Sequence, residues 1–239
     1  SYLNEDGKNY SVTERIENSD YIKDKFFNLS KPTINENIQI IGKKYVFNQG
    51  EHIIKKPIII PSGYELLINE DTTLKMSANT FIMVKNGVIK FNGTKEKPIY
   101  IKSISEDSKW GGIYVNSKLH PNKKSTLKYV DISNFSYFDS KKIQLTGGIN
   151  FINSNVELFN SSISKSSAED AINFVNSKFN LESIKINDVI SDGIDVDFGE
   201  GIINLSKFFK IGGDAIDFSG SSVLIKDVEI KDVKDKAVS

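Results

Sequence analysis

The chain has 239 residues, no cysteine, and equal numbers of acidic and basic side chains, 31 of each. The absence of cysteine excludes disulfide bonds, thiolate catalysis and cysteine-based metal sites. The charge balance argues against a dedicated nucleic-acid binder, which usually carries a basic excess, and no apolar run is long enough to span a membrane. Arg15 is the only arginine, and His52 and His120 are the only histidines, so few catalytic machines are available.

Residues 1–35 are polar and charged and lack the pattern that recurs farther along the chain. We expect residues 1–19, which are polar and charged, to form a linker or a disordered segment. Residues 20–50 are expected to cap the N-terminal end of the fold, with a short amphipathic helix at 20–27. Such a cap would cover strand edges that otherwise pair with other chains.

Short segments recur with a period of 22 residues in the C-terminal half. The clearest copies are Asp170-Ala171-Ile172, Asp192-Gly193-Ile194 and Asp214-Ala215-Ile216. The isoleucine position continues upstream at Ile149 and downstream at Val238. A second apolar set recurs 44 positions later, which is two repeats: Phe179, Leu181, Ile184, Ile186 and Val189 return as Val223, Ile225, Val228, Ile230 and Val233.

Within each repeat the apolar residues alternate with polar ones, which predicts short strands with one buried face. Helices of about 10 residues do not fit between them, so a βαβ sheet is unsuitable. Stacked coils can bury the apolar faces against their neighbours. The sequence therefore predicts an all-β fold, a parallel β-helix over residues 51–239, with about 22 residues and three short strands per coil.

Two loops are expected to protrude from the coils, at roughly 116–125 and 136–146, where ligand contacts are commonly placed. The last repeat stops at Ser239, one strand into a new coil. We expect further sequence of the same chain to follow it.

The repeats resemble the bacterial right-handed parallel β-helix repeat proteins of the pectate-lyase-like superfamily, and most closely the β-helix domain found with CotH-type envelope proteins. The segments that carry this resemblance are 168–173, 191–198, 213–221 and 235–239. It implies a right-handed β-helix, a polysaccharide or oligosaccharide as ligand, and an extracellular or cell-envelope location. Because function lies in sites rather than folds, it does not settle whether the domain is an enzyme.

Fragments of polygalacturonase motifs lie in the same segments. Ser191-Asp192-Gly193 resembles that family's Asn-Thr-Asp block and Gly213-Asp214-Ala215 its Gly-Asp-Asp block, which would make Asp192 and Asp214 catalytic acids. However, Gly213 replaces the first aspartate of the second block, and no histidine lies near 236–238. Alternatively, the once-per-coil aspartates Asp170, Asp192 and Asp214 bind backbone N–H groups at the turns.

An outward ladder is the other candidate site. If Ile194 and Val196 point inward, Asn173, Asp195 and Asp217 point outward on adjacent coils, with Asp197 beside them. Asp195 and Asp217 would then lie about 5 Å apart, which is also the separation of a retaining glycosidase pair. Three interpretations stay open: a solvated acidic strip, a carbohydrate-binding or catalytic site, and a bound cation such as Ca²⁺. No metal ligand set is identified, and no other cofactor is expected.

The same register places Asn150 and Tyr114 outward on earlier coils. Tyr114 and Trp110 are candidates to stack on sugar rings, with Asn150 and Asn173 as polar partners; Trp110 could instead pack in a corner. The candidate functions are a polysaccharide hydrolase or lyase, or a non-catalytic structural, adhesive or glycan-binding module. A lyase commonly uses an arginine base, and Arg15 lies outside the coils, which counts against a lyase.

Overall fold

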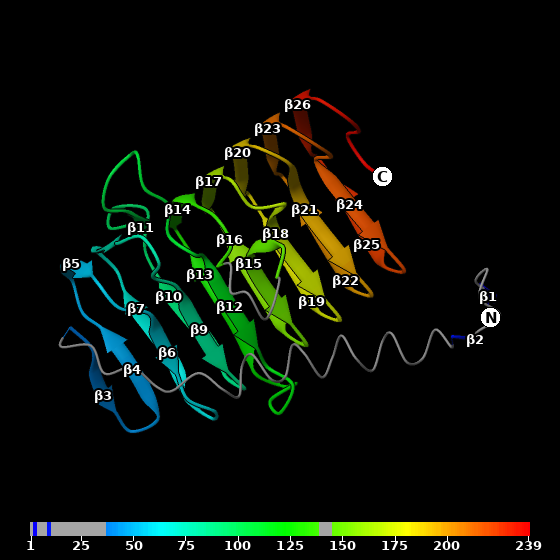
Figure 1. The fold of residues 1–239 in the computed structure, drawn as a ribbon. Coiled ribbons are helices and arrows are strands. Elements are labelled where there is room, and N and C mark those ends of the chain that lie inside the picture. The colour runs from blue at the N-terminus through cyan, green and yellow to red at the C-terminus, as the bar shows by residue number, and fades with distance from the viewer. Residues whose placement is uncertain (1, 4–8, 11–36, 139–144) are drawn as a thin grey trace.

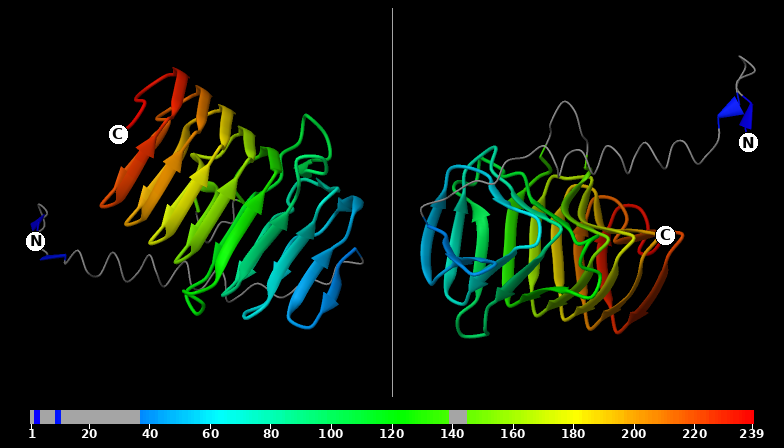
Figure 2. Two further views of the ribbon diagram at one scale, coloured as in Figure 1. Left: turned by 180° about the vertical axis from the view of Figure 1, so that it is seen from behind. Right: turned by 90° about the horizontal axis from the view of Figure 1, so that it is seen from below.

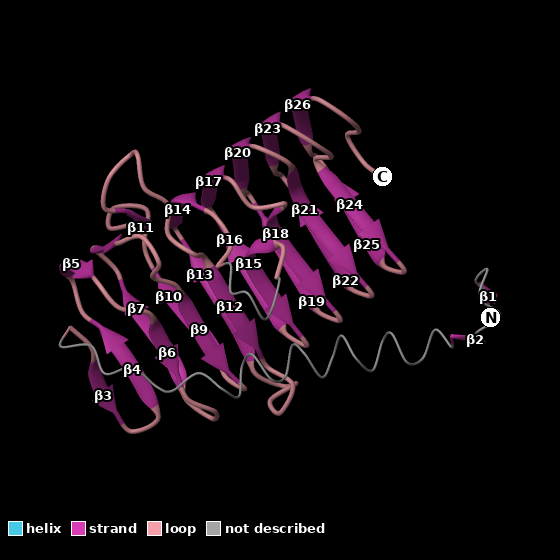
Figure 3. Cartoon of the chain, viewed as in Figure 1, coloured by secondary structure: helices cyan, strands magenta, loops and turns pink. Residues whose placement is uncertain are grey.

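The computed structural model describes residues 2–3, 9–10, 37–138 and 145–239. Three sheets of parallel strands wrap around one axis and form a solenoid of about 8 turns with about 23 residues per coil (Figure 1). The parallel β-helix and its three strands per coil are therefore confirmed, and the fold is right-handed. No helix occurs in the described ranges (Figure 3). The helix expected at 20–27 lies outside them.

Each full coil passes through the three sheets in turn. Sheet 1 contains β3 (Gln39–Ile41), β4 (Lys44–Phe47), β7 (Glu65–Asn69), β10 (Val88–Asn92), β13 (Lys124–Lys128), β16 (Asn155–Phe159), β19 (Lys178–Glu182), β22 (Glu200–Asn204) and β25 (Ser222–Lys226). Sheet 2 contains β5 (Gly50–Ile54), β8 (Thr72–Met76), β11 (Ile99–Ser103), β14 (Val130–Phe135), β17 (Ser162–Ser166), β20 (Lys185–Val189), β23 (Lys207–Ile211) and β26 (Glu229–Val233).

Sheet 3 contains β6 (Ile58–Ile60), β9 (Ile82–Lys85), β12 (Ile113–Asn116), β15 (Gly147–Ile152), β18 (Asp170–Val175), β21 (Asp192–Asp197) and β24 (Ile216–Ser219). The remaining strands, β1 (Tyr2–Leu3) and β2 (Asn9–Tyr10), pair only with each other, antiparallel. Figure 2 shows the coils in chain order from behind and from below.

The predicted ladders are present in the strand register. Ile149 pairs with Ile172, Ile172 with Ile194, and Ile194 with Ile216, all on the inward face of sheet 3. The same ladder ends in an isolated bridge between Ile216 and Val238. In sheet 1, Leu181 pairs with Ile203, which pairs with Ile225, so the repeat at 44 positions does span two coils.

The inward residues form one continuous core along the solenoid axis. It includes a stacked aromatic row in which the rings of Phe151 and Phe174 lie 5.5 Å apart and those of Phe174 and Phe179 lie 4.4 Å apart. Each fully buried side chain of this kind contributes about 1.5–3 kcal/mol relative to the exposed state. The core therefore explains why coils that could not fold singly are stable when stacked.

The corners between strands use left-handed backbone. Between sheets 1 and 2 this conformation recurs once per coil, at Tyr129, Asn160, Ser183, Leu205 and Asp227. Glycine supplies it at the corner before β12, where Gly112 has φ of +78° and a Cβ would lie 1.9 Å from the carbonyl oxygen of Gly148. A single left-handed residue turns the chain from one sheet into the next within one or two positions, which keeps the coils short.

The N-terminal edge is covered by β3, which pairs antiparallel with β4. β4 itself pairs in parallel with β7. The first coil therefore begins at Lys44, before the boundary at residue 51 that the repeat pattern predicts. The antiparallel β3 ends the run of parallel pairing on this side, which is one way to limit edge-to-edge association.

Candidate functional site

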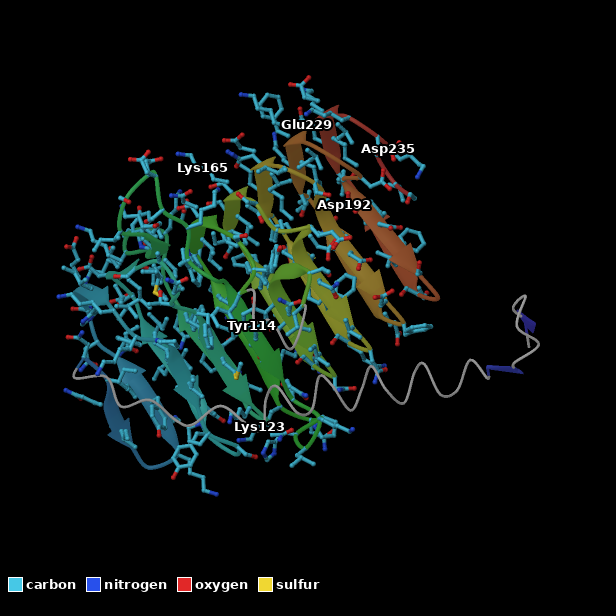
Figure 4. The ribbon with its side chains drawn as sticks, in the orientation of Figure 1. Tyr114, Lys123, Lys165, Asp192, Glu229 and Asp235 are labelled. Carbon is cyan, nitrogen blue, oxygen red and sulfur yellow. The ribbon has the colours of Figure 1, made fainter. Side chains whose placement is uncertain are left out.

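The outer face of sheet 3 changes character along the solenoid. One outward column runs through successive register partners: Ile59, Met83, Tyr114, Asn150, Asn173, Asp195 and Asp217. The predicted placement of Asn173, Asp195 and Asp217 on adjacent coils is thus confirmed. The column is apolar toward the N-terminus and polar, then acidic, toward the C-terminus. In Figure 4, Tyr114 lies among the middle coils and Asp192 lies farther along, on β21.

The apolar end of this column is covered. Ile59, Met83 and Tyr114 belong to a second buried cluster outside the solenoid core, which also contains Phe81 and Leu145. Tyr114 packs edge-on against Phe81, with ring centroids 6.2 Å apart, and its hydroxyl oxygen accepts a 2.5 Å hydrogen bond from the backbone N–H of Phe138. Burial, the largest effect, raises the pKa of Tyr114. Phe138 and Leu145 therefore help to cover the outer face here.

Two predicted sugar-stacking residues are unavailable to a ligand. Tyr114 and Trp110 are both 0% exposed. Trp110 belongs to the main core, lies beside Phe135, and donates its indole N–H to the carbonyl oxygen of Ser133 at 3.1 Å. The expectation that these rings stack on sugars is therefore corrected, because packing covers both. Corner packing, the alternative for Trp110, fits the structure.

Asn150 is also buried, at 2% exposure, and its amide donates to the carbonyl oxygen of Gly147 at 2.5 Å. That hydrogen bond joins the Asn150 side chain to the backbone at the first residue of the same strand, β15. Asn150 is thus occupied within the fold rather than presented to solvent.

A buried hydrogen-bonded group lies where the column turns polar. The amide nitrogen of Asn173 donates to Asp170 at 3.2 Å and to Asp195 at 3.0 Å, and the hydroxyl of Thr146 donates to Asp170 at 3.3 Å. Asn173 is 6% exposed, and its carbonyl oxygen Oδ1 has no hydrogen-bond donor among the described residues. One amide therefore links two carboxyl groups, which we call the Asp170–Asn173–Asp195 group.

Both carboxyls of this group hold their protons more tightly than usual. Burial, followed by the repulsion of neighbouring carboxylates, raises the pKa of Asp195 to about 7. Those neighbours are Asp170, Asp197 and Asp217. Burial also raises the pKa of Asp170 to about 6, although the hydrogen bond from Asn173 opposes the increase. Near neutral pH the group thus holds protons that ordinary aspartates have lost.

Asp217 and Asp197 complete the acidic end and are half-buried. Asp217 pairs with Asp195 in the register of β21 and β24, and its Oδ1 accepts a hydrogen bond from the Ser239 hydroxyl at 3.0 Å. Register partners on adjacent strands lie about 4.8 Å apart. Asp197 lies two positions after Asp195 and pairs with Ser219. The acidic end therefore brings one carboxyl of raised pKa next to others within one strand spacing.

Asp192 and Asp214 make the backbone contacts that the turn interpretation predicts. Oδ1 of Asp192 accepts the N–H of Asp214 at 2.8 Å, and Oδ1 of Asp214 accepts the N–H of Lys236 at 2.7 Å. Burial would raise the pKa of Asp214, but its contacts with Lys236 outweigh this and lower it. Burial raises the pKa of Asp192. Each carboxylate thus joins its coil to the next, and catalytic roles for these two remain predictions.

Asp170 is the residue whose part in the site the sequence did not reveal. It occupies the same repeat position as Asp192 and Asp214 but bonds side chains, Thr146 and Asn173, instead of backbone. The spacing Asp170-x-x-Asn173 is the available signal, because the asparagine replaces an aspartate found at Asp195 and Asp217.

Among the residues that the structure describes, no group of three or more histidine, aspartate and glutamate side chains is arranged to hold a metal ion. In the same part of the chain no helix has the length and apolar character that crossing a membrane requires.

Comparison with known proteins identifies the family. A family model described as the pectate-lyase-like beta helix domain matches residues 39–237. No curated protein and no solved structure matches the chain. The matched range covers nearly all of the solenoid. It begins with β3 and ends one residue before Val238, which forms the last bridge. The chain therefore belongs to the family of pectate-lyase-like β-helix domains.

Proposed function

We propose that this domain binds a polysaccharide along the acidic end of the outer face of sheet 3 and cleaves a glycosidic bond there. The observation that carries the proposal is the pairing of Asp195, whose pKa is raised to about 7, with Asp217 on the next strand. Glycosidases need two carboxyl groups with different roles, one of which holds a proton at working pH. Membership of the pectate-lyase-like family supports carbohydrate as the ligand class.

In this mechanism Asp195 is the general acid. Its proton passes to the glycosidic oxygen as the bond from that oxygen to the anomeric carbon breaks. Asp217, one strand spacing away, supplies the carboxylate that bonds to the anomeric carbon, as in a retaining glycosidase. Water then attacks the same carbon, gives its proton to Asp195, and releases Asp217, so one water is consumed per bond.

Asn173 and Asp170 act as positioning residues. The Asn173 amide donates hydrogen bonds to both Asp195 and Asp170 and so fixes the position of the Asp195 carboxyl. The carbonyl oxygen of Asn173 is buried without a hydrogen-bond donor among the described residues, so it lies beneath the surface that a sugar would contact.

A non-catalytic glycan-binding or structural module is the second candidate. It is favoured by the hydrogen bonds of Asp192 and Asp214 to the backbone, because these carboxylates near the same face help to hold the coils together. The third interpretation of the ladder, a bound Ca²⁺, stays a proposal that chelation would test. For either function we propose an extracellular or cell-envelope location, which family membership supports.

The test is reducing-end release from a panel of neutral and acidic polysaccharides. We expect release by the wild type, loss of at least about 100-fold with Asp195→Asn or Asp217→Asn, and decline as pH rises through about 7, where Asp195 loses its proton. Asp71→Asn, at an exposed aspartate in the corner between β7 and β8, is the matched control and is expected to keep full activity. Assays with Ca²⁺ and with a chelator separate the cation interpretation.

Release that persists in Asp195→Asn would overturn the catalytic assignment. Binding of a panel member without any release by the wild type would establish the glycan-binding module instead.

A further inference from the structure

A groove lies on a different face of the solenoid, at the corner between sheets 1 and 2. Its volume is about 560 Å³. Its floor is one outward column of sheet 2, formed by Tyr100, Asp131, Ser162 and Lys185, which are register partners on four successive coils. The groove therefore runs across the strands, along the solenoid axis.

The walls of the groove follow from corners of unequal length. On the coils of β13, β16 and β19 the corner into sheet 2 is short and turns on the left-handed residues Tyr129, Asn160 and Ser183, which line one side. The preceding coil has a longer connection, from β10 to β11, and its residues Lys95 and Pro98 form the end wall. A single longer turn beside short ones thus leaves a hollow.

The lining combines aromatic, hydroxyl and charged groups. Tyr100 is 40% exposed, with the Lys102 ammonium 5.9 Å from its ring centroid, and the Tyr129 hydroxyl accepts a hydrogen bond from the Asn160 amide at 3.1 Å. Asp131 accepts a hydrogen bond from the Ser162 hydroxyl at 2.6 Å. Lys95 and Lys185 are exposed, and neither has an acidic partner in the part of the chain that the structure describes.

The hollow continues toward the C-terminal coils. Lys185 also lines a second hollow of about 410 Å³ with Lys207, Phe209, Glu229 and Lys231. Lys207 and Glu229 extend the same floor column, because Lys185 pairs with Lys207 and Lys207 with Glu229. Phe209 is 40% exposed. The two hollows therefore form one elongated surface that spans six strands of sheet 2.

We propose that this surface is a second ligand site and that it binds an acidic oligosaccharide in an extended conformation. The ammonium groups of Lys95 and Lys185, which form no ion pair among the described residues, suit ligand carboxylates. The ring faces of Tyr100 and Phe209 that Lys102 and Lys210 leave open suit the apolar faces of sugar rings. Asp131 accepts the Ser162 hydroxyl and Glu229 pairs with Lys207 and Lys231, so lysines remain in excess over carboxylates on this surface. That mixture favours an acidic sugar over a nucleic acid, whose backbone needs a consistently basic track.

The site goes beyond the proposed cleavage at sheet 3. It lies on another sheet and uses none of the residues of the acidic column. An acidic polysaccharide held on sheet 2 would be anchored while sheet 3 remains free to act, which raises the effective concentration of chain at the second face.

The experiment is calorimetric titration with tetramannuronate and tetragalacturonate, each compared with the neutral tetramer of the same linkage. We expect the acidic tetramers to bind at least about 10-fold more tightly than the neutral ones and to weaken as salt rises. Lys185→Gln and Tyr100→Ala should each weaken binding about 10-fold. Lys226→Gln, at an exposed lysine on sheet 1, should leave binding unchanged.

Several results would overturn the proposal. These are no binding of either acidic tetramer by the wild type, affinity that Lys185→Gln does not change, and tighter binding of a single-stranded oligonucleotide than of the acidic tetramers. Loss of binding in Asp195→Asn would place the ligand at sheet 3 instead. Because binding here does not require turnover, failure of the proposed cleavage leaves this test intact.

Discussion

The two ends of the outer column of sheet 3 share one backbone geometry and differ in almost everything else. At the N-terminal end Ile59, Met83 and Tyr114 lie in a buried cluster. At the C-terminal end Asp195 and Asp217 occupy later positions of the same ladder and are half-buried carboxyls. The inward ladder is isoleucine at both ends. The core thus fixes the scaffold, and the outward residues decide whether the outer face of a coil is apolar and covered or acidic and half-buried.

The largest effect should come from truncating the covered end. Tyr114→Ala removes a fully buried ring and one hydrogen bond and should lower the free energy of unfolding by about 3–5 kcal/mol. Tyr114→Phe, which keeps the ring, should cost about 1 kcal/mol. Denaturant titration measures both. Equal and small losses would show that the outer cluster contributes little to stability.

The acidic end should make stability depend on pH. The pKa of Asp170, about 6, and that of Asp195, about 7, exceed the unfolded value near 4, so the folded state binds more protons between these limits. The free energy of unfolding that these two groups contribute is therefore fully present below about pH 4 and is lost as pH rises to about 7. Asp170 alone accounts for a loss of up to about 3 kcal/mol.

The control for this pH dependence is the neutral variant. In Asp170→Asn the fall in unfolding free energy between about pH 4 and about pH 7 should shrink, since one titrating group is gone. A wild-type curve that rises over this interval would contradict the raised pKa values.

A smaller effect is expected from the amide that joins the two carboxyls. Asn173→Ala removes the donor to Asp170 and Asp195 and should cost about 1–3 kcal/mol. It should also raise the pKa of Asp170 further, because the Asn173 hydrogen bond lowers it in the native protein. Asn180→Ala, at an exposed position on β19, is the matched control. Identical losses in the two variants would argue that the amide is not a linking group.

The smallest effect belongs to exposed charge near the acidic end. Glu200 pairs with Lys178 at 2.9 Å, and the two side chains are 66% and 72% exposed. Glu200→Gln should change the free energy of unfolding by no more than about 0.5 kcal/mol, since water screens such pairs. A loss above about 2 kcal/mol, well beyond what such surface pairs contribute, would mean that charge outside the buried group also matters.

The fold was predictable because every coil repeats the same demand for inward apolar residues. The ladder from Ile149 to Ile216 follows directly from a period of 22 residues. The outward ladder of Asn173, Asp195 and Asp217 follows from strand alternation, and its register is as expected.

What the sequence could not supply is which outward residues are covered. Alternation places Tyr114 and Asp195 on one face, but only the structure shows that Tyr114 is buried beside Phe81 and Phe138. The groove on sheet 2 was also missed, because it depends on one long turn beside short corners rather than on any motif. The lengths of the connections between strands therefore decide which outward residues are covered and where a groove forms, and the repeat pattern does not show this.

The most direct measurement is an NMR titration of the Asp195 side-chain carboxyl carbon, assigned by its loss in Asp195→Asn. We predict a midpoint near pH 7 that moves to lower pH in Asp217→Asn, where one repelling charge is removed. A midpoint below about pH 5 in the wild type would show an ordinary solvated aspartate and would contradict the assignment of Asp195 as the acid.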